Sequence, residues 1–238
     1  MSLSVSITPL VSAFPQCRIA VVVAEGLTIT PERPAALEAL IAAREAEART
    51  LWAGTELAQI PGIAAWRAAY KAFGIKQTRY RSSVERLVKN VLAGRELARI
   101  NAFVDLYNSV SLAHVLPLGA DDLDLVQPPL AFRYATETDT FVDMADAEAN
   151  GEGEAEAPKP GEVVYADAEK VLCRRWNWRQ DARSLITPAT RRAVVTVQSN
   201  GAGDVEAGAA DLVALIETFC GGTCRVAVLD AARPEAAL

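Results

Sequence analysis

The residues of this chain that could act as nucleophiles lack a histidine to activate them. The single histidine, His114, falls late in a predicted helix between Leu112, Ala113 and Val115, where a packing or capping role is the simpler explanation. No G-x-S-x-G turn is present, and no cysteine stands near a second histidine. If the protein is an enzyme, the sequence favours a reaction in which positioned polar groups direct water as the nucleophile.

Three polar side chains of a predicted helix could do such positioning. Tyr107, Asn108 and Ser111 are spaced three and four residues apart, which places them on one helix face. A helix whose polar groups only cap its end or meet solvent would show the same pattern. Both interpretations stay open at this point.

An aspartate cluster forms the second candidate. Pro117 and Gly119 precede Asp121, Asp122 and Asp124 in LPLGADDLD. The alternative is a turn whose aspartates bond to the local backbone.

The third candidate is VLCRRWNWRQDARSLIT, residues 171–187, which opens like a buried strand. It then places two tryptophans and three arginines within residues 174–179. Burying the arginines would cost free energy, and leaving the tryptophans in solvent would expose large apolar rings. One tryptophan could belong to the core, with arginine stems covering its rim. We expect at least one of the two to be structural.

Positive charge is concentrated although the net charge is −6. Residues 67–99 hold nine Lys/Arg against two acidic residues, and residues 174–192 hold six arginines against one. Residues 143–162 carry seven carboxylates and one lysine, and we predict a mobile acidic loop at about 144–158. Two basic stretches on a nearly neutral body suit a face that contacts phosphates, although solvated arginines on helix faces would look alike.

The elements that must position these residues indicate an α+β fold. The predicted strands are 17–27, 130–142, 161–176, 191–199 and 224–231, and the predicted helices are 32–54, 63–74, 82–94, 100–116 and 204–222. Ser82 and Glu85 are spaced as a capping box, and Asn101 is a plausible N-cap. Helices cluster in the first half and strands mainly in the second, unlike a repeating βαβ order.

Composition narrows the class of protein. A chain of 238 residues with 51% hydrophobic residues can bury a full core, and we expect a single domain over 1–238. The sequence has no apolar run long enough to span a bilayer and no basic leader, so we expect a cytoplasmic protein. With four sparse cysteines and one histidine, we expect reduced thiols, no metal and no cofactor.

Seven segments in this order resemble the freestanding B3/B4-domain proteins, which are similar to the editing domain of the phenylalanyl-tRNA synthetase beta subunit. They are WRAAYKAFG, RYRSSVERLVKNVL, INAFVDLYNSVSLAHVLPLGADDLD, FRYAT, GEVVYAD, VLCRRWNWRQ and ITPATRRAVVTVQ. The resemblance is strongest over 60–215. It implies an α+β fold with a β-sandwich-like core flanked by helices, and hydrolysis of the ester that joins a wrong amino acid to tRNA.

The chain departs from the synthetase pattern at two pocket walls. Gly119 stands where the synthetase domain has a pocket histidine, and residues 175–179 replace a short glycine-rich turn. Recognition of misattached tyrosine therefore does not carry over. The remaining aspartates would suit a cationic side chain, such as that of the arginine analogue canavanine.

The candidate residues fall into three groups. The residues expected to do catalysis by directing water are Asn108, Ser111 and Asn177. Those expected to bind the amino acid or the terminal adenosine are Tyr107, Gly119, Asp121, Asp122, Trp176 and Trp178. Those expected to bind the tRNA backbone are Arg79, Arg81, Arg86, Lys89, Arg174, Arg175 and Arg179.

The leading hypothesis is therefore an aminoacyl-tRNA deacylase that acts in trans. Two alternatives stay open: a binding module for amino acid or tRNA that has lost catalysis, and a small-molecule hydrolase with no RNA partner. The sequence sets no oligomeric state.

Overall fold

The computed structural model describes residues 3–76, 79–144 and 157–238. The helices of these residues are α1 (Ala35–Leu51), α2 (Pro61–Ala72), α3 (Ser83–Leu92), α4 (Ala102–His114) and α6 (Val205–Phe219). The strands are β1 (Ser4–Ser6), β2 (Cys17–Glu25), β3 (Leu118–Asp122), β4 (Leu130–Tyr134), β5 (Val163–Ala166), β6 (Val171–Arg174), β7 (Arg179–Gln180), β8 (Arg192–Asn200), β9 (Thr223–Leu229) and β10 (Glu235–Ala237). The predicted α+β class is confirmed.

The strands form two sheets. One has the order β3-β8-β2-β9, and the other has the order β10-β1-β4-β5-β6-β7. At the centre of the first sheet β2 and β8 pair antiparallel over their full length, from Cys17 opposite Asn200 to Glu25 opposite Arg192. Both strands are buried almost throughout, which explains their continuous runs of valine and alanine.

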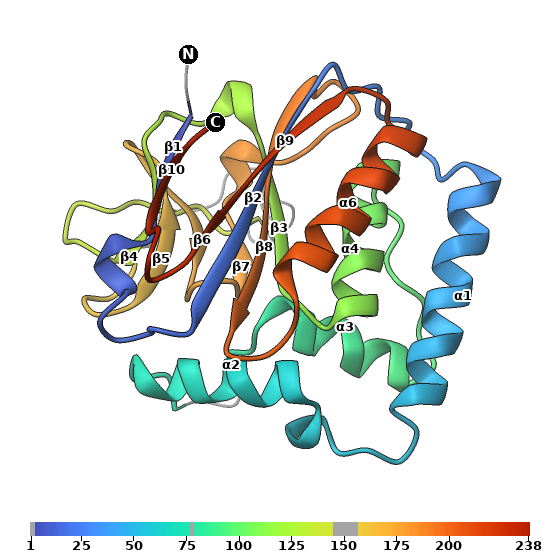
Figure 1. The fold of residues 1–238 in the computed structure, drawn as a ribbon, viewed down its shortest axis with the longest axis horizontal. Coiled ribbons are helices and arrows are strands. Elements are labelled where there is room, and N and C mark those ends of the chain that lie inside the picture. The colour runs from blue at the N-terminus through green and yellow to red at the C-terminus, as the bar shows by residue number, and fades with distance from the viewer. Residues whose placement is uncertain (1–2, 77–78, 145–156) are drawn as a thin grey trace.

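The helices cover one side of this sheet pair. Figure 1 shows α4 and α6 lying against the four-stranded sheet, with α1 outside them and α2 across one end of the strands. The two sheets and the helices share one hydrophobic core. In it the indole of Trp176 meets Phe14 and Trp66 edge to face, at ring centroid distances of 4.8 and 5.1 Å.

Two local predictions are wrong. Ser82 is the N-cap residue of α3, but its side chain makes no capping hydrogen bond, and the Glu85 carboxylate pairs with Arg67 and Arg81 instead of reaching back to Ser82. The predicted strand 161–176 is two strands, β5 and β6. Asp167 ends the first by accepting hydrogen bonds from the backbone N–H groups of residues 169 and 170.

The segment Leu118–Asp122, which could have been a turn, is the strand β3. The acidic loop predicted at about 144–158 lies outside the described residues, apart from 144, 157 and 158.

None of the helices in the described ranges combines the length and the apolar character needed to cross a bilayer.

Candidate functional site: a polar pocket between the two sheets

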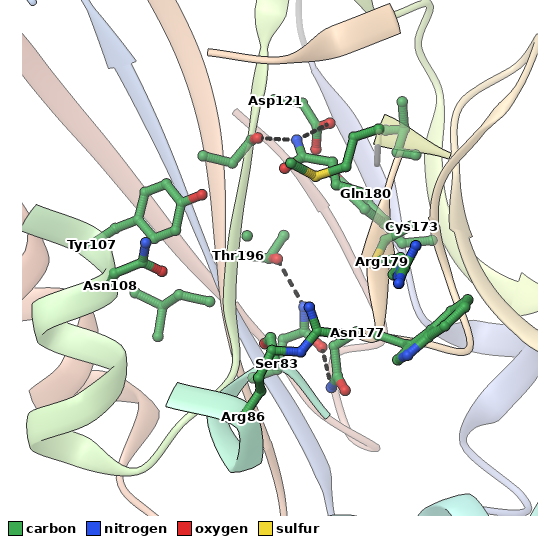
Figure 2. A pocket seen from close by; sticks show the side chains of 18 residues that line it. Ser83, Arg86, Tyr107, Asn108, Asp121, Cys173, Asn177, Arg179, Gln180 and Thr196 are labelled. Carbon is green, nitrogen blue, oxygen red and sulfur yellow. Dashed lines mark hydrogen bonds between the residues drawn. The ribbon is translucent and has the colours of Figure 1, made fainter. Parts of the chain in front are cut away.

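A pocket of about 370 Å³ lies between the two sheets. Strands β3 and β8 of the four-stranded sheet line one side, and β5, β6 and β7 of the other sheet line the opposite side. Helices α3 and α4 complete it with Ser83, Arg86, Tyr107 and Asn108 (Figure 2). The two layers of the fold therefore each contribute side chains to one cavity.

Helix α4 brings Tyr107 and Asn108 to the pocket but keeps Ser111 away from it. The helix starts where the Asn101 side chain accepts a hydrogen bond from the Val104 N–H, as predicted. Ser111 is buried, and its hydroxyl donates to the Leu116 carbonyl at 2.6 Å, beyond the end of the helix. The predicted catalytic role of Ser111 is wrong, because its hydroxyl is used to close the helix.

Strand β3 separates the two aspartates. Asp121 lines the pocket, whereas Asp122 accepts hydrogen bonds from the Asp124 N–H at 3.0 Å and the Thr190 hydroxyl at 2.6 Å. Successive side chains of a strand point to opposite faces, so only one of the pair can enter the pocket. The prediction that Asp122 binds substrate is wrong, since its carboxylate serves the local turn.

Asp121 is the buried carboxylate of the pocket. Its Oδ1 accepts hydrogen bonds from the Ser184 hydroxyl at 2.7 Å and the Gln180 amide at 3.0 Å. Burial raises the pKa of Asp121 to about 7, although these two hydrogen bonds oppose the rise. A carboxylate in this state gains most from a cationic partner that enters the pocket.

Gly119 leaves space in the pocket rather than avoiding a clash. It lines the cavity, and a Cβ placed on it would meet no atom within 4 Å. The absence of a side chain there adds to the volume that a ligand can use.

The turn between β6 and β7 sends consecutive side chains to different places. Arg175 and Trp176 have φ values of 47° and 67°, the left-handed region that suits glycine and is strained for a tryptophan. Trp176 is fully buried in the core, while Trp178 lines the pocket. One tryptophan is therefore structural, as expected. The predicted contact of Trp176 with substrate is wrong, because the turn directs its indole into the core.

Asn177 is held in the pocket wall by a chain of buried hydrogen bonds. Tyr70 donates to its Oδ1 at 3.0 Å, and its Nδ2 donates to the Gln198 Oε1 at 3.1 Å. Gln198 in turn donates to the Thr196 hydroxyl at 2.9 Å (Figure 2). Because Thr196 accepts from Gln198, its own proton is left to donate to a ligand in the pocket.

Three of the predicted phosphate-binding arginines, Arg174, Arg175 and Arg179, contact other side chains of the protein. Arg174 is fully buried and makes two hydrogen bonds to Glu162, at 3.0 and 3.1 Å. Arg179 pairs with Asp143 at 2.7 Å and is half-buried. The predicted phosphate contact of Arg174 is wrong, because a side chain with no exposed surface cannot reach a phosphate.

Arg175 is the centre of a stack of rings and guanidinium groups. It lies 3.8 Å from the ring centroid of Tyr80 and 4.4 Å from that of Trp178. Arg79 lies over the same Tyr80 ring, and Arg179 over the Trp178 ring. We call these five residues the cation–π stack. These contacts fix the position of the Trp178 indole at the edge of the pocket.

Several polar atoms at the pocket have no hydrogen-bond partner among the described residues. They are the Ser83 hydroxyl, the Tyr165 hydroxyl and the Trp178 Nε1, all of them buried atoms. A buried donor without a partner costs free energy unless water or a ligand satisfies it. Among the described residues, these three atoms are unpaired polar groups in residues of the pocket wall.

Four predicted phosphate contacts do share one surface. Arg79, Arg81, Arg86 and Lys89 line a shallow groove beside α3. Arg81 pairs with Glu85, whereas the other three have no ion pair with a described residue. Arg86 lines both this groove and the pocket, so the basic surface continues to the pocket mouth.

Part of the pocket is lined by residues that were not predicted as site residues. The missed polar members are Ser83, Tyr165, Cys173, Gln180, Thr196 and Gln198. One signal was available: Thr196 and Gln198 alternate with valines in the buried strand VVTVQ, which marks polar side chains on one inner face. The other four give no comparable pattern.

The thiol and the imidazole do not form a catalytic pair. Burial raises the pKa of the Cys173 thiol, which keeps it protonated. His114 contacts Asp211 at 3.0 Å on the helical side of the fold. Within the described residues no group of three His, Cys, Asp or Glu side chains is arranged to hold a metal ion.

Comparison with known proteins extends these observations. The chain is similar to a solved N-terminal fragment of the phenylalanyl-tRNA synthetase beta-subunit from Pyrococcus horikoshii, at 14% identity and a TM-score of 0.46. That match covers 93% of this chain and 50% of the solved chain, so this chain spans half its length. No curated protein matches. The family model "B3/4 domain" matches residues 65–221, which is more than half of the chain and includes every wall of the pocket. The chain belongs to the B3/4 domain family.

Proposed function

We propose that the protein hydrolyses the ester bond of a mischarged aminoacyl-tRNA, with the aminoacyl group in the pocket between the sheets. The proposal rests on one observation: the pocket and the basic groove are adjacent, because Arg86 lines both. A pocket with unsatisfied hydrogen-bond donors meets a basic groove there. An aminoacyl ester offers hydrogen-bond acceptors to the pocket, and an RNA backbone offers phosphates to the groove.

Water is the nucleophile in this proposal. Cys173 is held as a thiol, and no serine of the pocket has a histidine beside it among the described residues. The carboxamide of Asn108 and the hydroxyl of Thr196 face the cavity (Figure 2) and can orient a water or the ester carbonyl. Donors fixed before the substrate arrives stabilise the developing oxyanion without reorganisation.

The aminoacyl side chain is proposed to be cationic. Among the described residues that line the pocket Asp121 is the one carboxylate, and its Oδ2 accepts no hydrogen bond from them. A guanidinium-like group placed there would form a charge-assisted pair and favour the ionised carboxylate. An arginine analogue such as canavanine has this chemistry.

The RNA partner is proposed to lie along the groove of Arg79, Arg86 and Lys89. A protein with this substrate would work in the cytoplasm, where aminoacyl-tRNA is made and used.

A deacylation assay tests the proposal. Purified protein is mixed with tRNAs carrying cationic or neutral amino acids, and the release of the amino acid is followed. We expect Asn108→Ala to slow release of every amino acid, because Asn108 acts on the ester region. Asn90→Ala, a matched change on the outer part of α3, should have no effect.

Two results would replace the proposal with its alternatives. Binding of a non-hydrolysable aminoacyl-tRNA without cleavage of the natural ester would identify a binding module. Cleavage of small esters at the same rate with and without tRNA attached would identify a small-molecule hydrolase.

A further inference from the structure

A second hollow lies on the other side of the cation–π stack from the pocket. It has a volume of about 330 Å³ and is lined by residues 73–76, 79 and 80, by residues 159–162 before β5, and by Arg175. Its cationic members are Lys76, Arg79, Lys159 and Arg175. We call it the Lys76–Lys159 hollow.

The charge of this hollow is not balanced by its own carboxylate. Glu162 lines it too, but that carboxylate makes two hydrogen bonds to the fully buried Arg174, a third to the Arg175 N–H, and an ion pair with the Arg175 guanidinium at 3.8 Å. Among the described residues it therefore makes no ion pair with the three other cations of the hollow. Lys76, Arg79 and Lys159 are exposed and have no ion pair with a described residue. Cations that gather in a concave site raise the local concentration of anions.

The hollow is also rigid where it meets the stack. Arg175 is nearly fully buried, its guanidinium contacts both the Tyr80 and the Trp178 ring, and these two rings meet edge to face at a centroid distance of 4.9 Å. The backbone of Arg175 has the left-handed φ of 47°. Tyr80 lines the hollow, and Trp178 lines the pocket. The wall between the two cavities therefore contains Tyr80, Arg175 and Trp178, which all contact one another.

The basic groove beside α3 also connects the Lys76–Lys159 hollow with the pocket. Arg79 lines the hollow and the basic groove, and Arg86 lines the groove and the pocket. A polyanion that enters the hollow can thus follow an unbroken series of cationic side chains to the pocket mouth.

We infer that the Lys76–Lys159 hollow binds a backbone phosphate of a single-stranded RNA end whose terminal nucleotide lies at the pocket. The inference rests on the proposed function in taking RNA as the occupant. It adds a site in which Lys76 and Lys159 hold a phosphate and the stack fixes the distance from that phosphate to the pocket.

Salt-dependent binding tests this assignment. The probe is a short RNA that ends in CCA and is labelled at its 5′ end, and its affinity is measured by fluorescence anisotropy at several salt concentrations. The proteins compared are the wild type, Lys76→Ala, Lys159→Ala and the control Lys71→Ala, an exposed lysine of α2 outside the hollow. We expect each hollow variant to weaken binding and to reduce the slope of log Kd against log salt by about 0.7, the value for one phosphate contact on a single strand. The control slope should equal that of the wild type.

A neutral methylphosphonate placed at successive linkages of the RNA then identifies the phosphate. At one linkage it should weaken binding to the wild type and have no further effect on Lys159→Ala. Unchanged slopes in both hollow variants, or an equal change in Lys71→Ala, overturn the site. Its failure is separable from failure of the proposed function: deacylation with unchanged slopes rejects only the hollow, while reduced slopes without deacylation reject only the hydrolase.

Discussion

Replacing Asp121 with asparagine removes the charge of the pocket carboxylate and keeps the shape of the side chain. Its Oδ1, which accepts from Ser184 and Gln180, stays an acceptor in the variant. The folded protein holds the pKa of Asp121 at about 7 against an ordinary value of 3.8, mainly through burial. The wild type therefore carries an unfavourable buried charge at high pH that the variant lacks.

The magnitude follows from the two pKa values. A rise from 3.8 to about 7 corresponds to roughly 4 kcal/mol at full ionisation, at about 1.36 kcal/mol for each factor of ten. Water in the open pocket reduces this amount, so we expect Asp121→Asn to stabilise the protein by about 1–2 kcal/mol at pH 8. For a chain of this size that is about 3–6 °C in Tm.

The sign of the pH dependence is fixed by the direction of the shift. Between pH 4 and 7 the folded wild type binds more protons at Asp121 than the unfolded chain, so its stability falls as pH rises through this range. The gain in Asp121→Asn should therefore be largest at pH 8 and shrink steadily below pH 7, with less than half remaining at pH 5. Thermal melts across pH 5–8 measure it, with the exposed Asp124→Asn as control.

Activity gives the second readout. If Asp121 binds a cationic aminoacyl group, Asp121→Asn should reduce kcat/KM for that substrate roughly ten- to a hundredfold and leave neutral substrates unchanged. A variant that is no more stable than the wild type at pH 8, or equally stabilised at pH 5 and 8, would refute the account of a strained, buried carboxylate.

Three further changes separate structural roles from functional ones. Asp122→Asn should lower Tm and affect cationic and neutral substrates alike, because Asp122 serves Asp124 and Thr190; a substrate-specific loss in the deacylation assay would contradict this. Trp176→Ala should cost about 3–5 kcal/mol in urea denaturation, since it empties a fully buried site, and a loss below about 1 kcal/mol would place the indole outside the core. Glu162→Gln should cost about 3 kcal/mol in the same assay, because it leaves a buried arginine beside a neutral partner; an unchanged midpoint would speak against that pair.

Much of the fold could be predicted because its signals are local. The run of β-branched residues predicted β2, and the amphipathic pattern predicted α3 and α6. The division of 161–176 into two strands was missed because Asp167 ends β5 through hydrogen bonds to residues 169 and 170, in a stretch that reads as continuous strand. Pairing of β1 with β4 and β10 joins distant segments and leaves no pattern in any one of them.

The candidate site was predictable in part, at the level of segments more than of single side chains. Helical spacing placed Tyr107 and Asn108 correctly and Ser111 wrongly, because the pocket meets only one turn of α4. Asp121 and Asp122 were both predicted to bind substrate because the segment was not recognised as a strand, and the alternation of β3 admits Asp121 to the pocket and excludes Asp122. In both cases the tertiary packing decides whether a side chain enters the pocket. The sequence of one helix or strand does not show which other element packs against it.

The turn after β6 shows why the third cluster was the hardest to interpret. A regular strand has two faces, yet Arg175, Trp176, Asn177 and Trp178 go to a cation–π stack, the core, a hydrogen-bond chain and the pocket. The left-handed backbone of Arg175 and Trp176 interrupts the strand geometry, so these four consecutive side chains point to four different surroundings. Burial of Trp176 and the stack around Arg175 offset that backbone strain, so the residues that look surplus in the sequence are those that hold Trp178 and Asn177 in place.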